Sequence, residues 1–289
     1  MGGPLQFAVP TALQYFAALV ADDTGFAVTE AAVAVAQDDD PGLDTQAVLA
    51  QIDALGERFS RRLPADAPPL HRLRLFNRFF FHELGFAGNV NDYHDPRNSY
   101  LSEVIKSRRG IPITLALLYI ELAGQAGLTA SGVSFPGHFL VKLRMPRGEV
   151  LIDPFSGQSL SRDDLDERLI PFRRARGLVG DDEVPLGLFL QTAPPRDVIA
   201  RLLRNLKEIH RAAADLPRLV AVLDRLVVLL PEAWDERRDR ALALAELGRR
   251  EAAADDLAAY LDHCPGAADA PALRRRLEAW RALRRPRLH

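Results

Sequence analysis

The stretch that most constrains the fold is an apolar helix followed by two β-rich runs. Residues 113–127, ITLALLYIELAGQAG, are apolar on nearly every face, which is typical of a buried central helix, and Gly127 is suited to close it. The runs HFLVKLRM and EVLIDPF follow, with PRG as a tight turn between them. A helix followed by antiparallel strands predicts an α+β fold in which one sheet packs on the central helix.

Helical patterning precedes this block. Residues 5–85 carry apolar residues at helical spacing, and in HRLRLFNRFFFHELGF they form one stripe. Thr29 and Thr45 are suited to be N-caps of two of these helices. The next segment, AGNVNDYHDPRNSYL, is rich in Asn, Asp, Gly and Pro and predicts a structured loop, with Asn98 or Ser99 capping the short helix YLSEVIKSR. The N-terminal part is therefore expected to be a helical layer.

The C-terminal part predicts a helical repeat. Pro231 and Pro265 each close an apolar helix and are 34 residues apart, which is the tetratricopeptide period. Two such repeats followed by a helix over residues 271–283 form a short array. The segment PLGLFLQTAPPRD before them is interpreted as a linker. We expect a domain over residues 1–190 and an all-α tetratricopeptide-like domain over 196–289.

Composition limits the expected cellular location of the protein and the partners that it can bind. The single cysteine, Cys264, excludes an intramolecular disulfide, and the N-terminus lacks the basic start of a secretory signal, so we expect a cytoplasmic protein without a membrane partner. The last segment, LRRRLEAWRALRRPRLH, has seven Arg against one Glu. A solvated helix face is the favoured interpretation of this Arg-rich tail, and contact with nucleic acid is the alternative.

His138 and Asp153 are the residues that point to chemistry. Their separation suits two neighbouring strands joined by a tight turn, so an antiparallel pair can bring them side by side. In a cysteine–histidine–carboxylate site the histidine takes the proton of the thiol, and the carboxylate fixes the histidine tautomer. The thiol of such a site stands at a helix N-terminus, where unpaired N–H groups lower its pKa.

The blocks GNVNDYHDPRNSYLSEVIKSRRGIPITLALLYIEL, GVSFPGHFLVKL and LIDPFSG resemble the SirB-type transglutaminase-like proteins, which join such a domain to a tetratricopeptide tail. The resemblance covers about residues 70–265 and implies a papain-like core in an intracellular bacterial protein. It assigns Gly110 to the glycine before the nucleophile, and His138 and Asp153 to the other two triad positions. Pro112 stands at the position of the nucleophilic cysteine, which argues against acyl transfer through a thioester.

Other residues around this cleft are candidates for lesser roles. A ligand-binding role beside the cleft is predicted for Asn89, Tyr93, Asn98, Ser99 and Thr114. Thr114, Ser99, Ser107 and Ser134 are weak substitutes for the missing thiol, and Thr114 is more typical of a helix cap. Cys264 is best interpreted as a structural cysteine of the repeat tail.

No metal or cofactor is expected, because the sequence has no HExxH or CxxC spacing, no phosphate-binding loop and no dinucleotide fingerprint. The favoured hypothesis is a non-catalytic binding or regulatory protein whose cleft holds a peptide or small ligand and whose repeat tail docks a protein partner. The alternative is a peptidase- or amidase-like hydrolase or transferase that uses His138 and Asp153 with a water or hydroxyl nucleophile. A purely structural His138–Asp153 hydrogen bond is a further interpretation.

Overall fold

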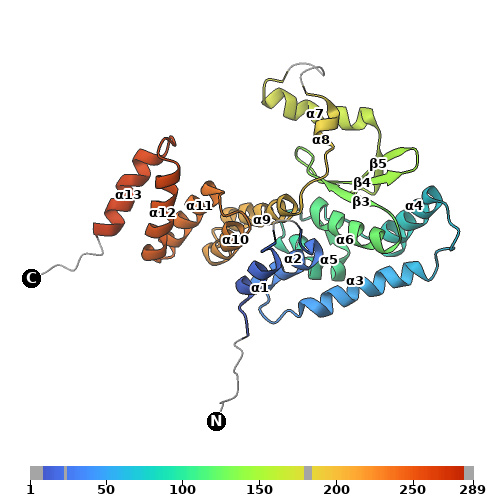
Figure 1. Cartoon of the computed structure of the whole chain (residues 1–289), viewed down its shortest axis with the longest axis horizontal. Coiled ribbons are helices and arrows are strands. Elements are labelled where there is room, and N and C mark those ends of the chain that lie inside the picture. The colour runs from blue at the N-terminus through green and yellow to red at the C-terminus, as the bar shows by residue number, and fades with distance from the viewer. Residues whose placement is uncertain (1–8, 23–24, 179–183, 283–289) are drawn as a thin grey trace, which may run out of the picture. The chain divides into compact units, whose positions relative to one another are not determined.

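The computed structural model describes residues 9–22, 25–178 and 184–282 (Figure 1). Contacts within the chain divide it into two compact units. The α+β unit comprises residues 23–202, and the helical unit comprises the segment before residue 23 together with the residues from 203 onward. Predictions that concern residues 1–8 and 283–289, including the last arginines of the tail, lie outside the described residues. Within the described ranges, no helix is long and apolar enough to cross a membrane.

Helices form one layer of the α+β unit, as the sequence predicts. An aromatic cluster joins them: Phe76 and Phe80 contact Tyr119 of the central helix edge-on, at ring-centroid distances of 4.9 and 5.1 Å, and Phe59 contacts Phe76 at 5.3 Å. The helices are α2 (Val28–Ala34), η1 (Val35–Asp38), α3 (Thr45–Ser60), α4 (Pro69–Asn77), the π-helical η2 (Arg78–Glu83), η3 (Pro96–Ser99), α5 (Leu101–Ser107) and α6 (Pro112–Gln125).

The central helix α6 is buried along most of its length, and Gly127 ends it in the left-handed conformation with φ of 72°. The amide of Leu128 then donates to the carbonyl of Ala123 at 2.9 Å, which satisfies a carbonyl of the last turn. The predicted role of Gly127 is confirmed. Because α6 packs on the sheet, its first residue, Pro112, has a fixed position relative to the sheet.

The sheet is antiparallel with the strand order β3 (Ala130–Val133), β4 (Leu140–Met145), β5 (Gly148–Asp153) and β6 (Gln158–Leu160). Its register pairs Val141 with Ile152 and Met145 with Gly148, so the predicted turn between the two runs is confirmed. Figure 1 shows α6 against one side of the sheet and α7 (Arg162–Ala175) with α8 (Leu186–Phe189) on the other. The predicted α+β class with an antiparallel sheet on a central helix is confirmed.

Two capping predictions are wrong. Helix α2 already begins at Val28 after Ala27, and the Thr29 hydroxyl instead donates to Glu121 of α6 at 2.6 Å. Helix α3 begins at Thr45 itself, because the carboxylate of the preceding Asp44 accepts the Ala47 amide and serves as the cap.

The cap predicted for α5 is also wrong. Its N-cap is Tyr100, which makes no side-chain capping bond. Asn98 and Ser99 belong to the 3₁₀ turn η3, which Asp95 caps by accepting the Arg97 amide at 2.9 Å. Asn98 and Ser99, which the sequence predicts as caps of α5, therefore belong to the preceding turn η3.

The segment interpreted as a linker is part of the α+β unit. Thr192 forms a β-bridge with Val133, and the amide of Ala193 donates to Gly132 at 2.9 Å. Lys142 Nζ donates to the carbonyl of Leu190 at 2.9 Å. The linker interpretation is therefore wrong, because the apolar residues of this segment pack on the sheet. The domain limits 1–190 and 196–289 stay a prediction, since compactness alone does not show which segments fold independently.

The helical unit contains the repeats that the sequence predicts. Its helices are α1 (Ala12–Leu19), most of α9 (Pro195–Ala212), α10 (Leu216–Leu229), α11 (Trp234–Glu246), α12 (Arg250–His263) and α13 (Ala270–Ala282). Helices α10 and α12 end just before Pro231 and Pro265, in accord with the 34-residue period. Buried charges tie the helices together: Lys207 of α9 pairs with Glu236 and Asp239 of α11. In the same unit, α1 packs on α10 with Phe16 under the guanidinium of Arg225.

Candidate functional site

His138 and Asp153 meet at one end of the sheet. Asp153 is the last residue of β5, and His138 lies just before β4. Because the two strands run antiparallel, both residues lie at the same end of the sheet. His138 Nε2 lies 2.8 Å from Asp153 Oδ1. The side chain of His138 is 21% exposed and that of Asp153 is 5% exposed. The spacing of the two residues in the sequence therefore brings them together, with the carboxylate inside and the imidazole at the surface of a pocket.

The Asp153 carboxylate has further donors. The amide of Phe155 donates to Oδ1 at 2.9 Å, and Arg168 Nη1 of α7 donates to Oδ2 at 3.1 Å. Burial alone would raise the pKa of Asp153, but His138, the Phe155 amide and Arg168 outweigh it and hold this pKa well below its usual range. Asp153 is therefore a firmly ionised carboxylate whose oxygens are both occupied.

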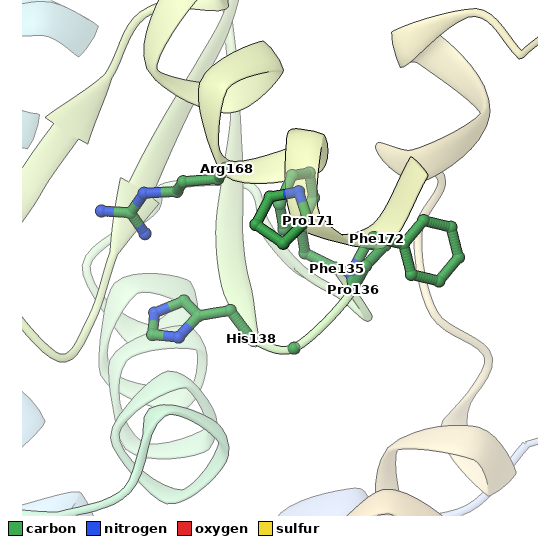
Figure 2. A pocket seen from close by; sticks show the side chains of 7 residues that line it. Phe135, Pro136, His138, Arg168, Pro171 and Phe172 are labelled. Atoms are coloured by element: carbon green, nitrogen blue, oxygen red, sulfur yellow. The ribbon is translucent and has the colours of Figure 1, made fainter. Parts of the chain in front are cut away.

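A cavity of about 610 Å³ opens beside this pair. Figure 2 shows His138 and Arg168 on one side of it and aromatic and proline side chains on the other. Its lining residues are Phe135, Pro136, Gly137, His138, Arg168, Pro171 and Phe172. Of the residues that the structure describes, no acidic side chain lines the cavity, and the polar side chains that do are the imidazole of His138 and the guanidinium of Arg168.

Hydrogen bonds to Asp153 use only part of these two groups. His138 is bonded through Nε2, and Arg168 through Nη1. Within the described part of the chain, His138 Nδ1 and the Nε and Nη2 atoms of Arg168 have no hydrogen-bond partner. Both side chains can therefore bind a second molecule without breaking their bonds to Asp153.

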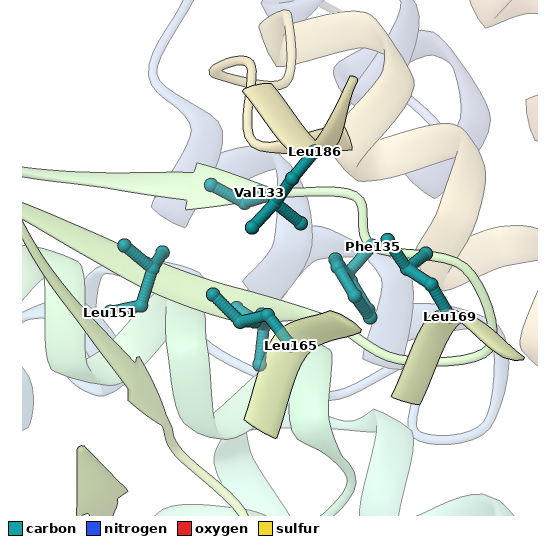
Figure 3. Close-up of a cluster of buried hydrophobic side chains, with 7 residues drawn as sticks. Val133, Phe135, Leu151, Leu165, Leu169 and Leu186 are labelled. Carbon is teal, nitrogen blue, oxygen red and sulfur yellow. The ribbon is translucent and has the colours of Figure 1, made fainter. Parts of the chain in front are cut away.

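Helix α7, which carries Arg168, is held on the sheet by a buried apolar cluster (Figure 3). The cluster consists of Val133, Phe135, Leu140, Leu151, Leu165, Leu169 and Leu186. Leu165 and Leu169 lie on either side of Arg168 in the helix sequence, at helical spacing. Packing of these leucines directs Arg168 toward the Asp153 end of the sheet.

The start of α6 is connected to the same site through Phe155. Strand β2 (Arg109–Gly110) leads into Pro112 and pairs in parallel with β1 (Ala87–Gly88). The amide of Gly88 donates to the carbonyl of Phe155 at 2.9 Å, and the Phe155 ring lies 6.5 Å from the His138 ring. A Cβ at Gly88 would lie 2.3 Å from the Phe155 ring, so this close approach requires glycine. The chain of contacts runs from the helix start to the His138–Asp153 pair.

Comparison with known proteins identifies this arrangement. Residues 46–204 match the family model of the transglutaminase-like superfamily, and residues 206–278 match a tetratricopeptide repeat model. A UPF0162 protein of Xylella fastidiosa (strain 9a5c) is 36% identical over 249 residues, which cover 84% of this chain and 86% of that protein. The chain belongs to the transglutaminase-like superfamily and to the UPF0162 family.

Other similarities are more distant. The UPF0162 protein YchA of Escherichia coli (strain K12) is 28% identical over 229 residues, 78% of this chain and 81% of that protein. A crystal structure of menin covers 85% of this chain and 68% of its own at 10% identity, with a TM-score of 0.39, which establishes no shared fold. The resemblance seen in the sequence, a transglutaminase-like core joined to a tetratricopeptide tail, is confirmed.

Several residues that the sequence places beside the transglutaminase-like cleft bind one another. Asn89 Nδ2 donates to Asn98 Oδ1 at 3.0 Å, and Asn98 Nδ2 donates to the carbonyl of Asp92 at 2.7 Å. The Thr114 hydroxyl donates to the carbonyl of Asn98 at 2.8 Å and accepts from the Ile111 amide at 3.2 Å. This network, called here the loop anchor, ties the Asn-rich loop to the first turn of α6.

Burial separates the predicted ligand-binding residues into two groups. Asn98, Ser99 and Thr114 are buried. Tyr93 is 39% exposed, its ring lies 6.0 Å from that of Phe155, and burial of the rest of the side chain raises its pKa against the opposing charge of Arg201. A ligand role for these residues stays a prediction, and Tyr93 is the one with the most surface to offer.

The substitutes proposed for the missing thiol are engaged or lie elsewhere. The Thr114 hydroxyl belongs to the loop anchor, and that of Ser107 bonds to the carbonyls of Glu103 and Arg109. Ser134 is exposed and accepts from Arg201 at 3.4 Å, while Cys264 is the C-cap residue of α12 in the helical unit. The residues described by the structure include no group of three or more metal-ligating side chains.

Sequence reasoning missed Arg168 and Phe155. The stretch SRDDLDERL predicts a capped helix, and the structure confirms this with a capping box at Ser161. Nothing in that pattern shows which of its charged residues faces the sheet. The available signal is the position of Arg168 between Leu165 and Leu169, on the edge of the buried stripe.

The loop anchor predicts a specific loss of stability. Thr114→Val keeps the shape of the side chain but leaves the buried Ile111 amide and Asn98 carbonyl without this partner, so we expect the free energy of unfolding to fall by about 1–3 kcal/mol. Urea unfolding measures the change. Thr129→Val, at an exposed threonine, is the matched control and should have little effect. Equal midpoints for the two variants would contradict a structural role of the anchor.

The depressed pKa of Asp153 predicts a pH dependence. Because the folded chain favours the ionised form, Asp153 contributes stability above about pH 3.9, the ordinary Asp pKa, and this contribution is lost as the pH falls toward the lower folded pKa. Asp153→Asn should therefore lose less unfolding free energy than the wild type between neutral pH and about pH 3. Asp163→Asn, at an exposed position of α7, should keep the wild-type slope. Urea titrations at each pH measure these slopes, and a wild-type slope in Asp153→Asn would refute the assignment.

Proposed function

We propose that this protein binds a ligand in the transglutaminase-like cleft without forming a covalent intermediate, and that the repeat tail docks a protein partner. The observation that carries this proposal is Pro112 as the first residue of α6. Catalysis by a cysteine–histidine pair requires a thiol at this helix start, where the helix dipole and free amides activate it. A proline there supplies no nucleophile.

Proline also weakens the oxyanion site. The first amides of a helix are free to donate to a developing negative charge, and they are the donors that such a site offers. Pro112 has no N–H, so the helix start has one donor fewer at this position. Both the nucleophile and part of the stabilisation of the transition state are therefore lost at the same residue.

Arg168 supports the same conclusion from the other side of the site. In a catalytic triad the carboxylate stabilises the imidazolium that forms when histidine accepts a proton. Here a permanent cation 3.1 Å from Asp153 Oδ2 already neutralises much of that charge. The pair is better arranged to hold His138 in place than to increase its basicity during a reaction.

One observation favours a second candidate, a hydrolase in which His138 activates water. His138 lines an open cavity, and its Nδ1 has no partner among the described residues. A water bound at Nδ1 would face the cavity, and the imidazole could accept its proton. This hypothesis predicts turnover of an ester or amide that depends on His138.

The partners follow from the same features. Tetratricopeptide arrays present concave surfaces that bind extended protein segments, so the tail is assigned to a protein partner. A cytoplasmic location fits the single cysteine. Binding of nucleic acid through the Arg-rich tail is the lesser alternative. It predicts an affinity that weakens steeply with salt.

Activity measurements test the proposal directly. We expect the wild-type protein to release no ammonia from an N-protected Gln-Gly dipeptide and to hydrolyse no peptide amide, and His138→Ala to be indistinguishable from it. Turnover by the wild type that is abolished in His138→Ala would overturn the proposal and favour the hydrolase.

A second experiment tests the position assigned to Pro112. In a Cys264→Ser background, Pro112→Cys introduces a single thiol at the start of α6. We expect it to react with iodoacetamide about tenfold faster than the same variant carrying His138→Ala, because a neighbouring imidazole raises the thiolate fraction. The wild-type protein, with Cys264 alone, gives the reference rate. Equal rates with and without His138 would show that Pro112 does not face the His138–Asp153 pair.

A further inference from the structure

We propose that the cavity beside His138 is a carboxylate-binding site. It takes a carboxylate joined to an apolar group, as at the C-terminus of a peptide that ends in a large apolar residue. Arg168 donates to the carboxylate beside His138, and Phe172 with the two lining prolines, Pro136 and Pro171, contacts the apolar group. This inference rests on the proposed function, because it names the ligand class of the same non-catalytic cleft.

The first step is the inventory of donors. The side chain of Arg168 lines the cavity and is 35% exposed; it uses one amino group on Asp153, which leaves Nε and Nη2 without a partner among the described residues. A guanidinium edge with two N–H groups matches the two oxygens of a carboxylate. His138 lines the same cavity; because its Nε2 bonds to Asp153, Nδ1 can donate to a ligand only when both ring nitrogens are protonated.

The charge around these donors favours an anionic ligand. A ligand carboxylate must not be repelled by Asp153, and the structure meets this condition. Asp153 is nearly inaccessible, accepts from three donors and does not line the cavity. Among the described residues, the cavity lining includes a permanent cation and no acidic side chain, so a bound anion meets positive charge first.

The walls of the cavity are mostly apolar. Apart from His138 and Arg168, the lining side chains are two phenylalanines and two prolines. Figure 2 shows the proline and phenylalanine side chains of α7 opposite His138. Apolar walls favour an apolar neighbour of the carboxylate over a free inorganic anion.

The donor set also favours a carboxylate over a phosphate. A phosphate carries about two charges and is typically held by several cations or by a helix N-terminus. The described lining has one permanent cation, and the N-terminus of α7 is closed by the Ser161–Asp164 capping box and carries Asp163. One guanidinium edge and one imidazole fit a single planar carboxylate.

Matched peptide probes test the proposal on the full-length protein. The probes are N-acetyl-Ala-Phe with a free C-terminus, the same dipeptide as its amide, and N-acetyl-Glu-Phe-amide. Binding is followed by NMR through the imidazole signals of His138, identified by their absence in His138→Asn. We expect the free acid to bind about tenfold tighter than the amide, because a charge-assisted bidentate contact is lost in the amide.

The acidic-side-chain probe distinguishes two sources of the carboxylate. If N-acetyl-Glu-Phe-amide binds as tightly as the free acid, the carboxylate chemistry is confirmed and the assignment to a chain terminus is overturned, because a side-chain carboxylate serves equally well. If it binds like the neutral amide, the source is the chain terminus. Equal affinity of all three probes, or a free acid that fails to shift His138 up to its solubility limit, would overturn the proposal.

Variants test whether Arg168 is responsible for the preference for the free acid over the amide. Arg168→Gln should remove the difference between acid and amide, whereas Arg174→Gln, at an exposed position of α7 outside the cavity, should keep it. Arg168→Lys preserves the charge beside Asp153 and serves if the Gln variant does not fold; it should retain a weaker preference because lysine lacks the planar edge. A full preference for the acid in both Arg168 variants would overturn the assignment.

The outcome for the carboxylate site and the outcome for the proposed function can be told apart. If the amide and the acid both shift His138 equally and neither is consumed, binding without catalysis stands and the carboxylate inference fails. If the amide is hydrolysed during the titration, the proposed function fails, whatever the preference for the acid.

Discussion

The arrangement of the site depends on one buried carboxylate, Asp153. Its donors come from three parts of the chain: His138 before β4, the Phe155 amide after β5, and Arg168 on α7. A buried charge that loses a partner is costly, by several kcal/mol in the general case, so each of these parts is constrained to stay where its donor reaches Asp153. The carboxylate thereby joins the hairpin, the turn after it and the covering helix, and it sets the orientation of the imidazole.

The contacts that hold the residues of the site in place do not depend on whether the site catalyses a reaction. The frame of a transglutaminase-like core is the helix start, the strand histidine and the strand carboxylate, and all are present here. Phe155 holds them together, since its amide bonds to Asp153, its carbonyl accepts from Gly88 beside the helix start, and its ring faces His138. None of these contacts requires a thiol. Pro112 is also a favourable first residue of a helix, so the start of α6 is stable with proline at this position.

The sequence predicts those parts that depend on local patterning. The buried helix, its end at Gly127, the hairpin that brings His138 to Asp153, and the 34-residue repeat all follow from periodicity and turn chemistry. It does not predict contacts that are decided by tertiary packing. Whether Arg168 faces the sheet depends on how Leu165 and Leu169 pack, and the polar segment after α8 joins the sheet because its neighbours are apolar. Thr29 does not cap α2 because the helix begins one residue earlier, and Asp44, the residue before Thr45, caps α3 in its place.

The persistence of the His138–Asp153 pair is therefore weak support for catalysis, because folding alone accounts for it. The informative groups are those that folding does not use. Two of the three guanidinium nitrogens of Arg168 and one nitrogen of His138 make no hydrogen bond among the described residues, and both side chains line one apolar cavity. Exposed donors next to apolar walls stabilise no internal contact, whereas they are what recognition of a small acid requires. His138 and Arg168 thus each bond to the buried Asp153 through one nitrogen and leave their other nitrogens without a partner among the described residues.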